Sequence, residues 1–364
     1  MFDVIVIGAG IAGLVCAQQL HSCGYKVAVV EKSRGLGGRV ATRRLYDTRA
    51  DHGACYLKPK EELLGRFVQL LSSRGILQVW TDTVYKYSTT QKLQAAVDSF
   101  RYIAPDGMSA IAKFLATGLD IRLQQRVESI TPVKAHGGSP LHWHLSLDTK
   151  TDIITQPPLT ALAVVMAIPA PQALTILQQA ETELPAVFLE QLRCVEFDPC
   201  LSVIAGYPAE LHPAPDWKAI TFVDDSDLGW IGLDSSKRLE AGHSLVFVLQ
   251  SSAEFARKYL EAEDLQPFGH QLLTRASKCL LPWLADPEWM QVHRWRYAFP
   301  RRPLQAAYLS ATSPLPLVCS GDWCGGNLIE SAMHSGIAAA EQINLQLDGR
   351  SLREDNFFDF LSQV

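Results

Sequence analysis

A glycine-rich turn close to the start of the chain, GAGIAG at residues 8–13, constrains the fold more than any other segment. The apolar run from Asp3 to Ile7 predicts a buried parallel strand, and the residues after the turn predict a helix over about 11–22. A second apolar run, 26–31, predicts the next strand and ends on Glu31. Strand, glycine turn, helix, strand and acid in this order predict a β-α-β unit that binds a dinucleotide, rather than a purely structural turn.

Each glycine of this turn has a predicted role. Gly8 permits the tight turn, Gly10 lets a pyrophosphate approach the backbone, and Gly13 lets the helix pack on the strand. The free amides at the start of the helix then face the phosphates, and Glu31 accepts the ribose hydroxyls. The candidate cofactor contacts in this unit are Gly8, Gly10, Ile11, Ala12, Gly13, Glu31 and Lys32.

A basic segment that follows the second strand distinguishes NAD from FAD, which share this unit. In RGLGGRVATRR, Gly38 and Arg39 supply backbone amides and a guanidinium that suit the longer pyrophosphate-ribityl arm of a flavin. Found alone, such a segment would indicate a solvated basic loop. Because it comes directly after a dinucleotide fingerprint, it favours FAD.

A second acid-and-glycine turn, CSGDWCGGNLIESAMHSG at 319–336, again precedes a predicted helix, which begins near Gly326. Asp322 suits a ribityl hydroxyl, and the helix N-terminus suits the negative charge of a reduced flavin. Asn327 and Leu328 are candidate contacts there. The apolar face of this helix is expected to bury against the sheet. The two turns should therefore bracket one elongated cofactor from opposite ends of the chain.

The remaining pattern predicts an α/β fold with two interleaved domains. ALAVVMAIP at 161–169 and the apolar run 315–320 resemble central strands of the first sheet, whereas 171–303 alternates short strands with helices. A Gly-Gly turn at 137 and 138 predicts a hairpin. The expected segments are 1–56, 104–170 and 304–350 for the FAD-binding domain, and 57–103 and 171–303 for an α+β substrate domain.

The composition argues against several classes of protein. A charged fraction of 20%, a formal net charge of -5 and a pI near 6.1 give no basic surface for nucleic acid, and no apolar run is long enough for a membrane span. Eight cysteines without a Cys-x-x-Cys pair indicate reduced thiols rather than disulfides or a zinc site. With a strand directly after Met1, this predicts a cytoplasmic protein without a metal, and the oligomeric state stays open.

Several motifs, in order, resemble one known group. VIGAGIAG, GGR, DHGACY, YIAPDGMSAIAKFL, MAIPAPQAL, HRWRYA and SGDWCGGNLIESAMHSGIAAAE resemble the FAD-dependent oxidoreductases of the flavin amine oxidase superfamily, and most closely the renalase family. The resemblance implies a glutathione-reductase-type FAD-binding Rossmann domain, an interleaved α+β substrate domain and a flavin ring at their junction. It implies further cofactor contacts at Ala54, Cys55, Tyr56 and the backbone of Val127. Cys324 lies beside Asp322 and thus near the ribityl chain, so noncovalent FAD is expected.

The renalase resemblance also implies a reaction. The donor is a dihydronicotinamide dinucleotide reduced at the wrong ring carbon, which passes hydride to flavin N5. NAD(P)+ is returned, and molecular oxygen takes the electrons as hydrogen peroxide. The alternatives are an oxidase of small amines and an FAD-binding regulatory protein without turnover. Many amine oxidases place a lysine near flavin N5, and the matching stretch, Phe197 to Tyr207, contains none.

Three residues are candidates for contact with the reacting groups. Strand alternation in WMQVHRWRYA puts Trp295 and Tyr297 on one face, which suits either a nicotinamide sandwich or ordinary core packing. His52, in the DHGACY turn, suits either a hydrogen bond to flavin N5 or substrate, or a structural role. The sequence shows no nucleophile triad, metal spacing or paired-carboxylate motif.

Overall fold

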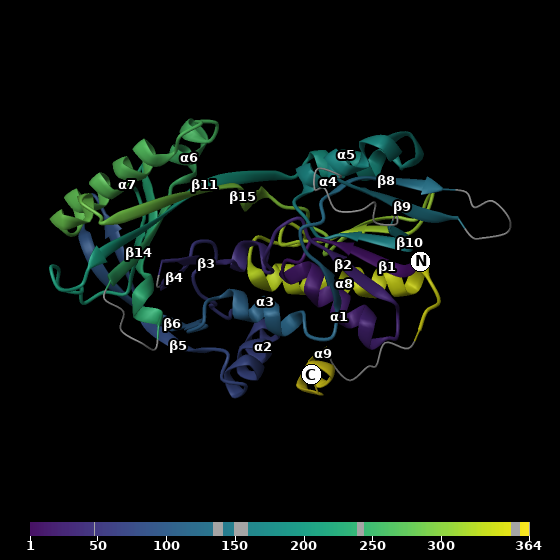
Figure 1. Ribbon diagram of the computed structural model, residues 1–364, viewed down its shortest axis with the longest axis horizontal. Helices are drawn as coiled ribbons and strands as arrows, with labels where there is room; N and C mark the ends of the chain where they lie inside the picture. Colours follow the sequence, from purple (N-terminus) through teal and green to yellow (C-terminus); the bar gives the residue numbers. More distant parts are fainter. Residues whose placement is uncertain (47, 134–140, 149–158, 239–243, 351–356, 364) are drawn as a thin grey trace.

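The computed structural model describes residues 1–46, 48–133, 141–148, 159–238, 244–350 and 357–363, and its strands form two large sheets and one hairpin (Figure 1). The predicted Gly-Gly turn at 137 and 138 lies outside the described residues. The long strands β11 (Glu196–Pro208) and β15 (Trp289–Arg302) extend from the second sheet toward the first. Among the described helices, none has the length and apolar character that a membrane crossing requires.

The first sheet is mostly parallel and has the N-terminal strand near its centre. Its main path is β16-β17-β10-β1-β2-β7, and the β8–β9 hairpin joins it through β10. Ile7 lies beside both Val30 and Met166, so three neighbouring strands end at the glycine turn. The strands are β1 Phe2–Ile7, β2 Val27–Val30, β7 Asp120–Arg122, β8 Val127–Val133, β9 His142–Leu147, β10 Leu159–Met166, β16 Leu309–Ala311 and β17 Leu317–Cys319.

Helices cover both faces of this sheet, which explains why its central strands are apolar throughout. Side chains of β1 alternate between two cores, one containing Val4 and Val6 and the other Ile5 and Ile7. The helices of the first core include α1 Ile11–Ser22, α2 Glu62–Ser73, α3 Ser109–Leu115, α8 Ile329–Gln346 and α9 Phe357–Gln363. Those of the second are α4 Ala170–Leu177 and α5 Ala186–Arg193.

The second sheet has the strand order β15-β11-β14-β13-β12-β5-β6 and is antiparallel except between β12 and β5. Two helices pack on one of its faces through a third core. Its elements are β5 Gln78–Ser88, β6 Lys92–Ile103, β12 Ala219–Phe222, β13 Leu228–Leu233, β14 Ser244–Ser251, α6 Ala253–Tyr259 and α7 Gln266–Cys279. The hairpin β3 (Thr42–Leu45) and β4 (Thr48–Asp51) lies between the two sheets (Figure 1). The exact boundaries of the two predicted domains stay a prediction.

The last long helix differs from its prediction. It begins at Ile329 rather than near Gly326, because its N-cap residue Leu328 has an extended backbone, with φ of -120° and ψ of 170°. It also packs closely on α1, in addition to its contact with the sheet. A Cβ at Gly336 would lie 2.5 Å from the carbonyl oxygen of Ala12, so this glycine is what allows the close approach of the two helices.

Candidate active site

The three glycines of the first turn occupy different environments. Gly8 has φ of 106°, and a Cβ at Gly13 would lie 2.0 Å from the carbonyl oxygen of Gly8, so both serve the packing of strand, turn and helix. A Cβ at Gly10, in contrast, would meet nothing within 4 Å. The first backbone amides of any α-helix have no intrahelical partner. Gly10 is the N-cap of α1 and has no side chain that could accept hydrogen bonds from them. Open space therefore lies in front of unpaired donors.

Glu31 stands at one end of this turn. Its two carboxylate oxygens accept hydrogen bonds from the amides of Ala9, at 2.9 Å, and Ser33, at 2.8 Å. An ionised carboxylate has about four acceptor positions, so capacity remains for ribose hydroxyls. The Glu31 backbone also pairs with Arg122 and Gln125, which brings the start of β8 at Val127 to the same corner. Lys32 is exposed beside it, with Nζ 3.4 Å from Oε1 of Gln172.

The turns from the two ends of the chain meet at Arg39. Its guanidinium donates to both carboxylate oxygens of Asp322 at 2.6 Å and to the carbonyl of Ala298 at 3.1 Å. Gly38 lies against the first turn, since a Cβ there would be 3.5 Å from Cα of Gly10. The predicted bracketing of one region by both turns therefore has a direct geometric basis.

Two predicted contacts lie at the margin of this arrangement. Asn327 and Leu328 immediately precede α8, and Leu328 is its N-cap and is exposed. Within the described residues, neither makes a hydrogen bond to another predicted site residue. Their role as cofactor contacts stays a prediction.

The segment after β4 joins the cofactor residues to β15. The amide of Ala54 donates to the carbonyl of Arg39 at 2.7 Å, and Nε1 of Trp295 donates to the carbonyl of His52 at 2.8 Å. A Cβ at Gly53 would lie 2.1 Å from the Arg39 oxygen and 3.2 Å from the Trp295 ring. Arg39, the 52–54 segment and Trp295 are thus packed directly on one another.

An imidazole and indole patch forms where this segment meets β15, and we define it as His52, His293 and Trp295. The His52 ring lies 4.6 Å from His293 and 5.2 Å from Trp295, and the last two rings are 4.4 Å apart. Tyr297, on the same face of the strand, instead makes an edge contact with Phe197 of β11 at 5.6 Å. The structure therefore brings Trp295 to His52 but leaves Tyr297 in a packing contact. His293 was not among the predicted site residues.

Both histidines of the patch are uncharged at neutral pH. Burial, with the nearby His293 and Arg43, lowers the pKa of His52 to about 3. Burial and Arg43 lower the pKa of His293 to about 4. Nδ1 of His52 is buried and has no hydrogen-bond partner among the described residues.

This protonation state predicts an acid-dependent loss of stability. His52 titrates near 6.5 when unfolded but near 3 when folded, so the unfolded chain takes up a proton between these values and the free energy of unfolding falls as pH falls. Between pH 7.5 and 5.0 the wild type should lose about 2 kcal/mol more than His52→Gln, measured by urea unfolding. Equal losses in the two proteins would contradict a buried neutral histidine.

A largely buried ionic network includes Asp51, the residue directly before His52. Nζ of Lys237 lies 3.2 Å from Asp51 and 2.6 Å from Asp234, and Arg238 pairs with both carboxylates. Asp51 also accepts from the amide of Met108 at 2.8 Å. Burial alone would raise the pKa of Asp51, but the Lys237 and Arg238 cations lower it overall. The sequence prediction missed this network because Asp51 lies 183 residues before Asp234 in the chain.

Comparison with known proteins decides the family. A family model described as flavin containing amine oxidoreductase matches residues 62–344, which is more than half of the chain, and a model of the NAD(P)-binding Rossmann-like domain matches residues 6–71. The chain belongs to the flavin-containing amine oxidoreductase family.

Individual relatives match shorter parts of the sequence. The chain is 40% identical over 130 residues to the putative flavin-containing monoamine oxidase AofH of Mycobacterium tuberculosis, covering 35% of this chain and 26% of that protein. It is 39% identical over 92 residues to flavin-containing amine oxidase B of Rattus norvegicus, covering 25% of this chain and 16% of that protein. The match thus spans about a quarter or less of these relatives' length.

Solved structures share the fold over nearly the whole chain. Putrescine oxidase bound to putrescine has a TM-score of 0.67 at 14% identity, covering 94% of this chain and 99% of that one. Cyclohexylamine oxidase from Brevibacterium oxydans has a TM-score of 0.68 at 15% identity, with 95% and 99% coverage. At such identities the likeness shows the fold alone, and it agrees with the predicted Rossmann domain and sheet-rich second part.

FAD is the cofactor of this family member, and the residues present fit it. The space in front of Gly10 and the free amides of α1 suit a diphosphate. The remaining acceptor positions of Glu31 suit a ribose, and Asp322 supplies a carboxylate for further hydroxyls. These hydrogen-bond donors and acceptors are therefore those of a dinucleotide site that extends from the first turn toward the last.

The nearby cysteines agree with noncovalent attachment of FAD. Burial raises the pKa of Cys324 to about 12, and its Sγ lies 3.9 Å from the carbonyl of Cys319. Cys55 is also buried, with its pKa raised by burial, and its Sγ lies 3.1 Å from the carbonyl of Asp51. Neither thiol is a thiolate at neutral pH, so neither is an activated nucleophile. Tyr56, next to Cys55, packs 6.3 Å from the Trp80 ring.

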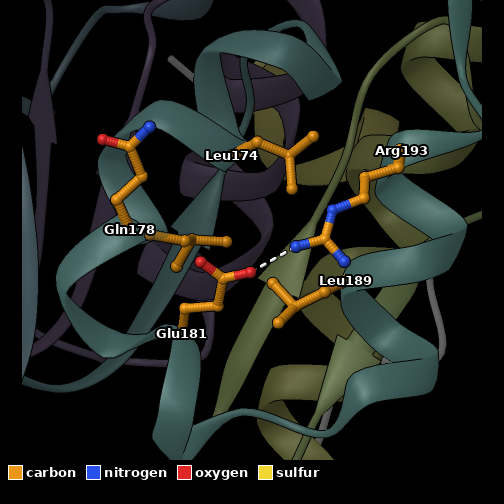
Figure 2. Close-up of a pocket in the computed structure, with 6 residues that line it drawn as sticks. Leu174, Gln178, Glu181, Leu189 and Arg193 are labelled. Atoms are coloured by element: carbon orange, nitrogen blue, oxygen red, sulfur yellow. Dashed lines mark hydrogen bonds and ion pairs between the residues drawn. The ribbon is translucent and has the colours of Figure 1, made fainter.

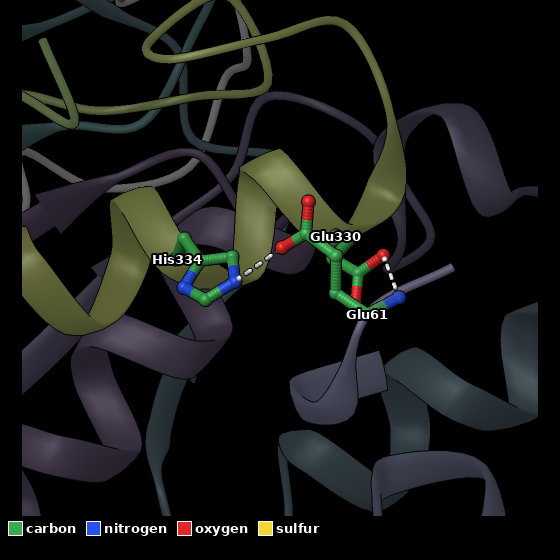
Figure 3. A group of neighbouring side chains, drawn as sticks. All are labelled: Glu61, Glu330 and His334. Carbon is green, nitrogen blue, oxygen red and sulfur yellow. Dashed lines mark hydrogen bonds and ion pairs between the residues drawn. The ribbon is translucent and has the colours of Figure 1, made fainter. Parts of the chain in front are cut away.

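Two other clusters lie outside this site. A pocket between α4 and α5 is lined by residues that include Leu174 and the ion pair of Glu181 with Arg193, and no predicted site residue lines it (Figure 2). A group of Glu61, Glu330 and His334 sits where α8 meets α2 (Figure 3). The Glu330 carboxylate accepts from the backbone amides of Leu64, at 3.0 Å, and Glu61, at 3.2 Å, so it caps α2.

Proposed function

We propose that this chain is an FAD-dependent oxidase of dihydronicotinamide dinucleotides reduced at the wrong ring carbon. The products are NAD(P)+ and, after electron transfer to molecular oxygen, hydrogen peroxide. The observation that carries this proposal is the character of the patch beside the cofactor residues. His52, His293 and Trp295 are held uncharged, and none of the three is a carboxylate or a lysine.

Such a patch suits a donor that needs no acid-base help. A dihydropyridine becomes aromatic when it gives up hydride, and FAD, when bound, supplies the acceptor. The protein then has to position the ring and exclude water. The flat indole of Trp295, fixed by its hydrogen bond to the His52 carbonyl, offers a stacking surface, and the neutral imidazoles flank it.

The buried Lys237 does not replace the lysine that many amine oxidases place near flavin N5. Phe197 to Tyr207 contains no lysine. Lys237 is buried beside Asp51, the residue directly before His52. Its Nζ is held by Asp51 and Asp234, and those carboxylates raise its pKa against the effect of burial. It is therefore a fixed cation and not a proton acceptor at neutral pH.

A small-amine oxidase is the second candidate, favoured by the names of the relatives described above. The test is anaerobic mixing of the purified holoprotein with borohydride-treated NAD, which contains the misreduced isomers, or with a panel of small amines. Bleaching of the flavin absorbance by the first, followed by peroxide on addition of oxygen, is the expected result. Bleaching by amines alone would replace the proposal with amine oxidation, and no bleaching would favour a regulatory FAD protein.

A further inference from the structure

The β3–β4 hairpin carries an arginine to the edge of the patch. The hairpin lies along β15, since the Tyr46 ring is 5.2 Å from Trp289. Arg43 is opposite Ala50 in the hairpin, and Ala50 lies two residues before His52 in the chain. Arg43 is half-buried, and its charge acts on both His52 and His293. Its pairing with Ala50 also places it across the hairpin from a residue that lies two positions before His52.

Arg43 forms no ion pair with any residue that the structure describes. Among the described residues, no ion pair or side-chain hydrogen bond involves its guanidinium. Asp51, which is opposite the neighbouring Thr42 in the hairpin, is already neutralised by Lys237 and Arg238. An unpaired guanidinium in a half-buried position is a strong donor for phosphate or carboxylate oxygens.

A second observation also points to a ligand here. Among the residues that the structure describes, Nδ1 of His52 has no hydrogen-bond partner, although His52 is only 5% exposed. A buried polar atom of this kind normally has a partner, so the position suits a hydrogen bond with a bound molecule. His52 belongs to the same patch as Trp295, which offers the stacking surface.

We propose that Arg43 is a specificity-determining residue that binds a phosphate of the substrate's nucleotide. This inference rests on the proposed function, and it explains why the protein would oxidise a dinucleotide rather than an amine. The same guanidinium repels the ammonium group of an amine, so one residue favours an anionic dinucleotide and disfavours a cationic donor.

The test compares Arg43→Gln with Arg44→Gln. Arg44 is the adjacent residue, is exposed, and projects from the opposite face of the strand, so its loss controls for net charge. The donors are borohydride-treated NAD and borohydride-treated N-methylnicotinamide, which has no phosphate. Arg43→Gln should raise KM for the dinucleotide about ten- to a hundredfold, and it should raise KM for the N-methyl donor much less. Arg44→Gln should change neither.

Binding of NAD+ to the oxidised holoprotein, followed by calorimetry, tests the inference without turnover. Arg43→Gln should bind about tenfold or more weakly than wild type, with Arg43→Lys in between, and an unchanged flavin spectrum verifies folding. Equal affinity in wild type and Arg43→Gln would overturn the role of Arg43 and leave the proposed reaction standing. Arg43-dependent NAD+ binding without oxidation of either donor would overturn the reaction and keep the phosphate site.

Discussion

Replacing Lys237 with methionine is expected to lower the free energy of unfolding by about 3–5 kcal/mol. The side chain is fully buried and neutralises Asp51 and Asp234, which are also fully buried. Methionine matches the length of the lysine stem but leaves two carboxylates facing the single charge of Arg238. Burying an uncompensated charge costs far more than the loss of one exposed ion pair. Urea unfolding of wild type and Lys237→Met at pH 7.5 measures this difference.

A matched control is Lys58→Met, which removes the ion pair of Lys58 with the more exposed Asp98. Its expected cost is small by comparison, because exposed pairs are screened by solvent. The network also fixes Asp51, which directly precedes His52 in the patch beside the cofactor residues. Lys237→Met should therefore disturb this patch and alter the flavin spectrum, whereas Lys58→Met should not. Equal stability of Lys237→Met and wild type would show that the network is not a neutralised buried quartet.

Replacing Gly10 with valine is expected to abolish FAD binding while leaving the apoprotein folded. The backbone at Gly10, with φ of -80° and ψ of -179°, is open to any residue, and an added Cβ meets no protein atom within 4 Å. The new side chain would instead fill the space that suits the diphosphate. Loss of several charge-assisted hydrogen bonds corresponds to at least about a hundredfold weaker binding. Titration of apoprotein with FAD, followed by flavin fluorescence, measures the affinity.

Gly13→Val separates this effect from simple misfolding. A Cβ at Gly13 would lie 2.0 Å from the Gly8 carbonyl oxygen, so this variant should lose thermal stability as apoprotein. Gly10→Val should melt at the wild-type temperature without cofactor. Wild-type FAD affinity in Gly10→Val would mean that the cofactor does not pass in front of this glycine.

The parts of this fold that follow from local pattern were predictable. The β1-α1-β2 unit is set by an apolar strand, a glycine turn and a helical period within one continuous stretch. Strand β9, with the sequence HWHLSL, follows from its alternating pattern, and the central strand β10 follows from a fully apolar run. In each case the pattern that specifies the element lies inside the element itself.

The missed features depend on contacts between distant segments. Lys237 and Arg238 lie in the polar run DSSKR, whose composition is that of a solvated loop, and only the fold brings Asp51 to them. The packing of α8 on α1 depends on Gly336 meeting Ala12. The grouping of Arg43 with His52 and His293 depends on how a hairpin lies along β15. Residue patterns carry no signal for such pairings.

The most direct test of the proposed oxidase activity is an anaerobic titration of the holoprotein with purified dihydronicotinamide dinucleotide isomers. Donors reduced at ring carbon 2 or 6 should bleach one flavin per molecule and release one NAD+, and oxygen should then restore the absorbance with one hydrogen peroxide. NADH reduced at carbon 4 should react far more slowly. Equal rates for all isomers, or a flavin that none of them reduces, would contradict the proposed oxidation of dihydronicotinamide dinucleotides reduced at the wrong ring carbon.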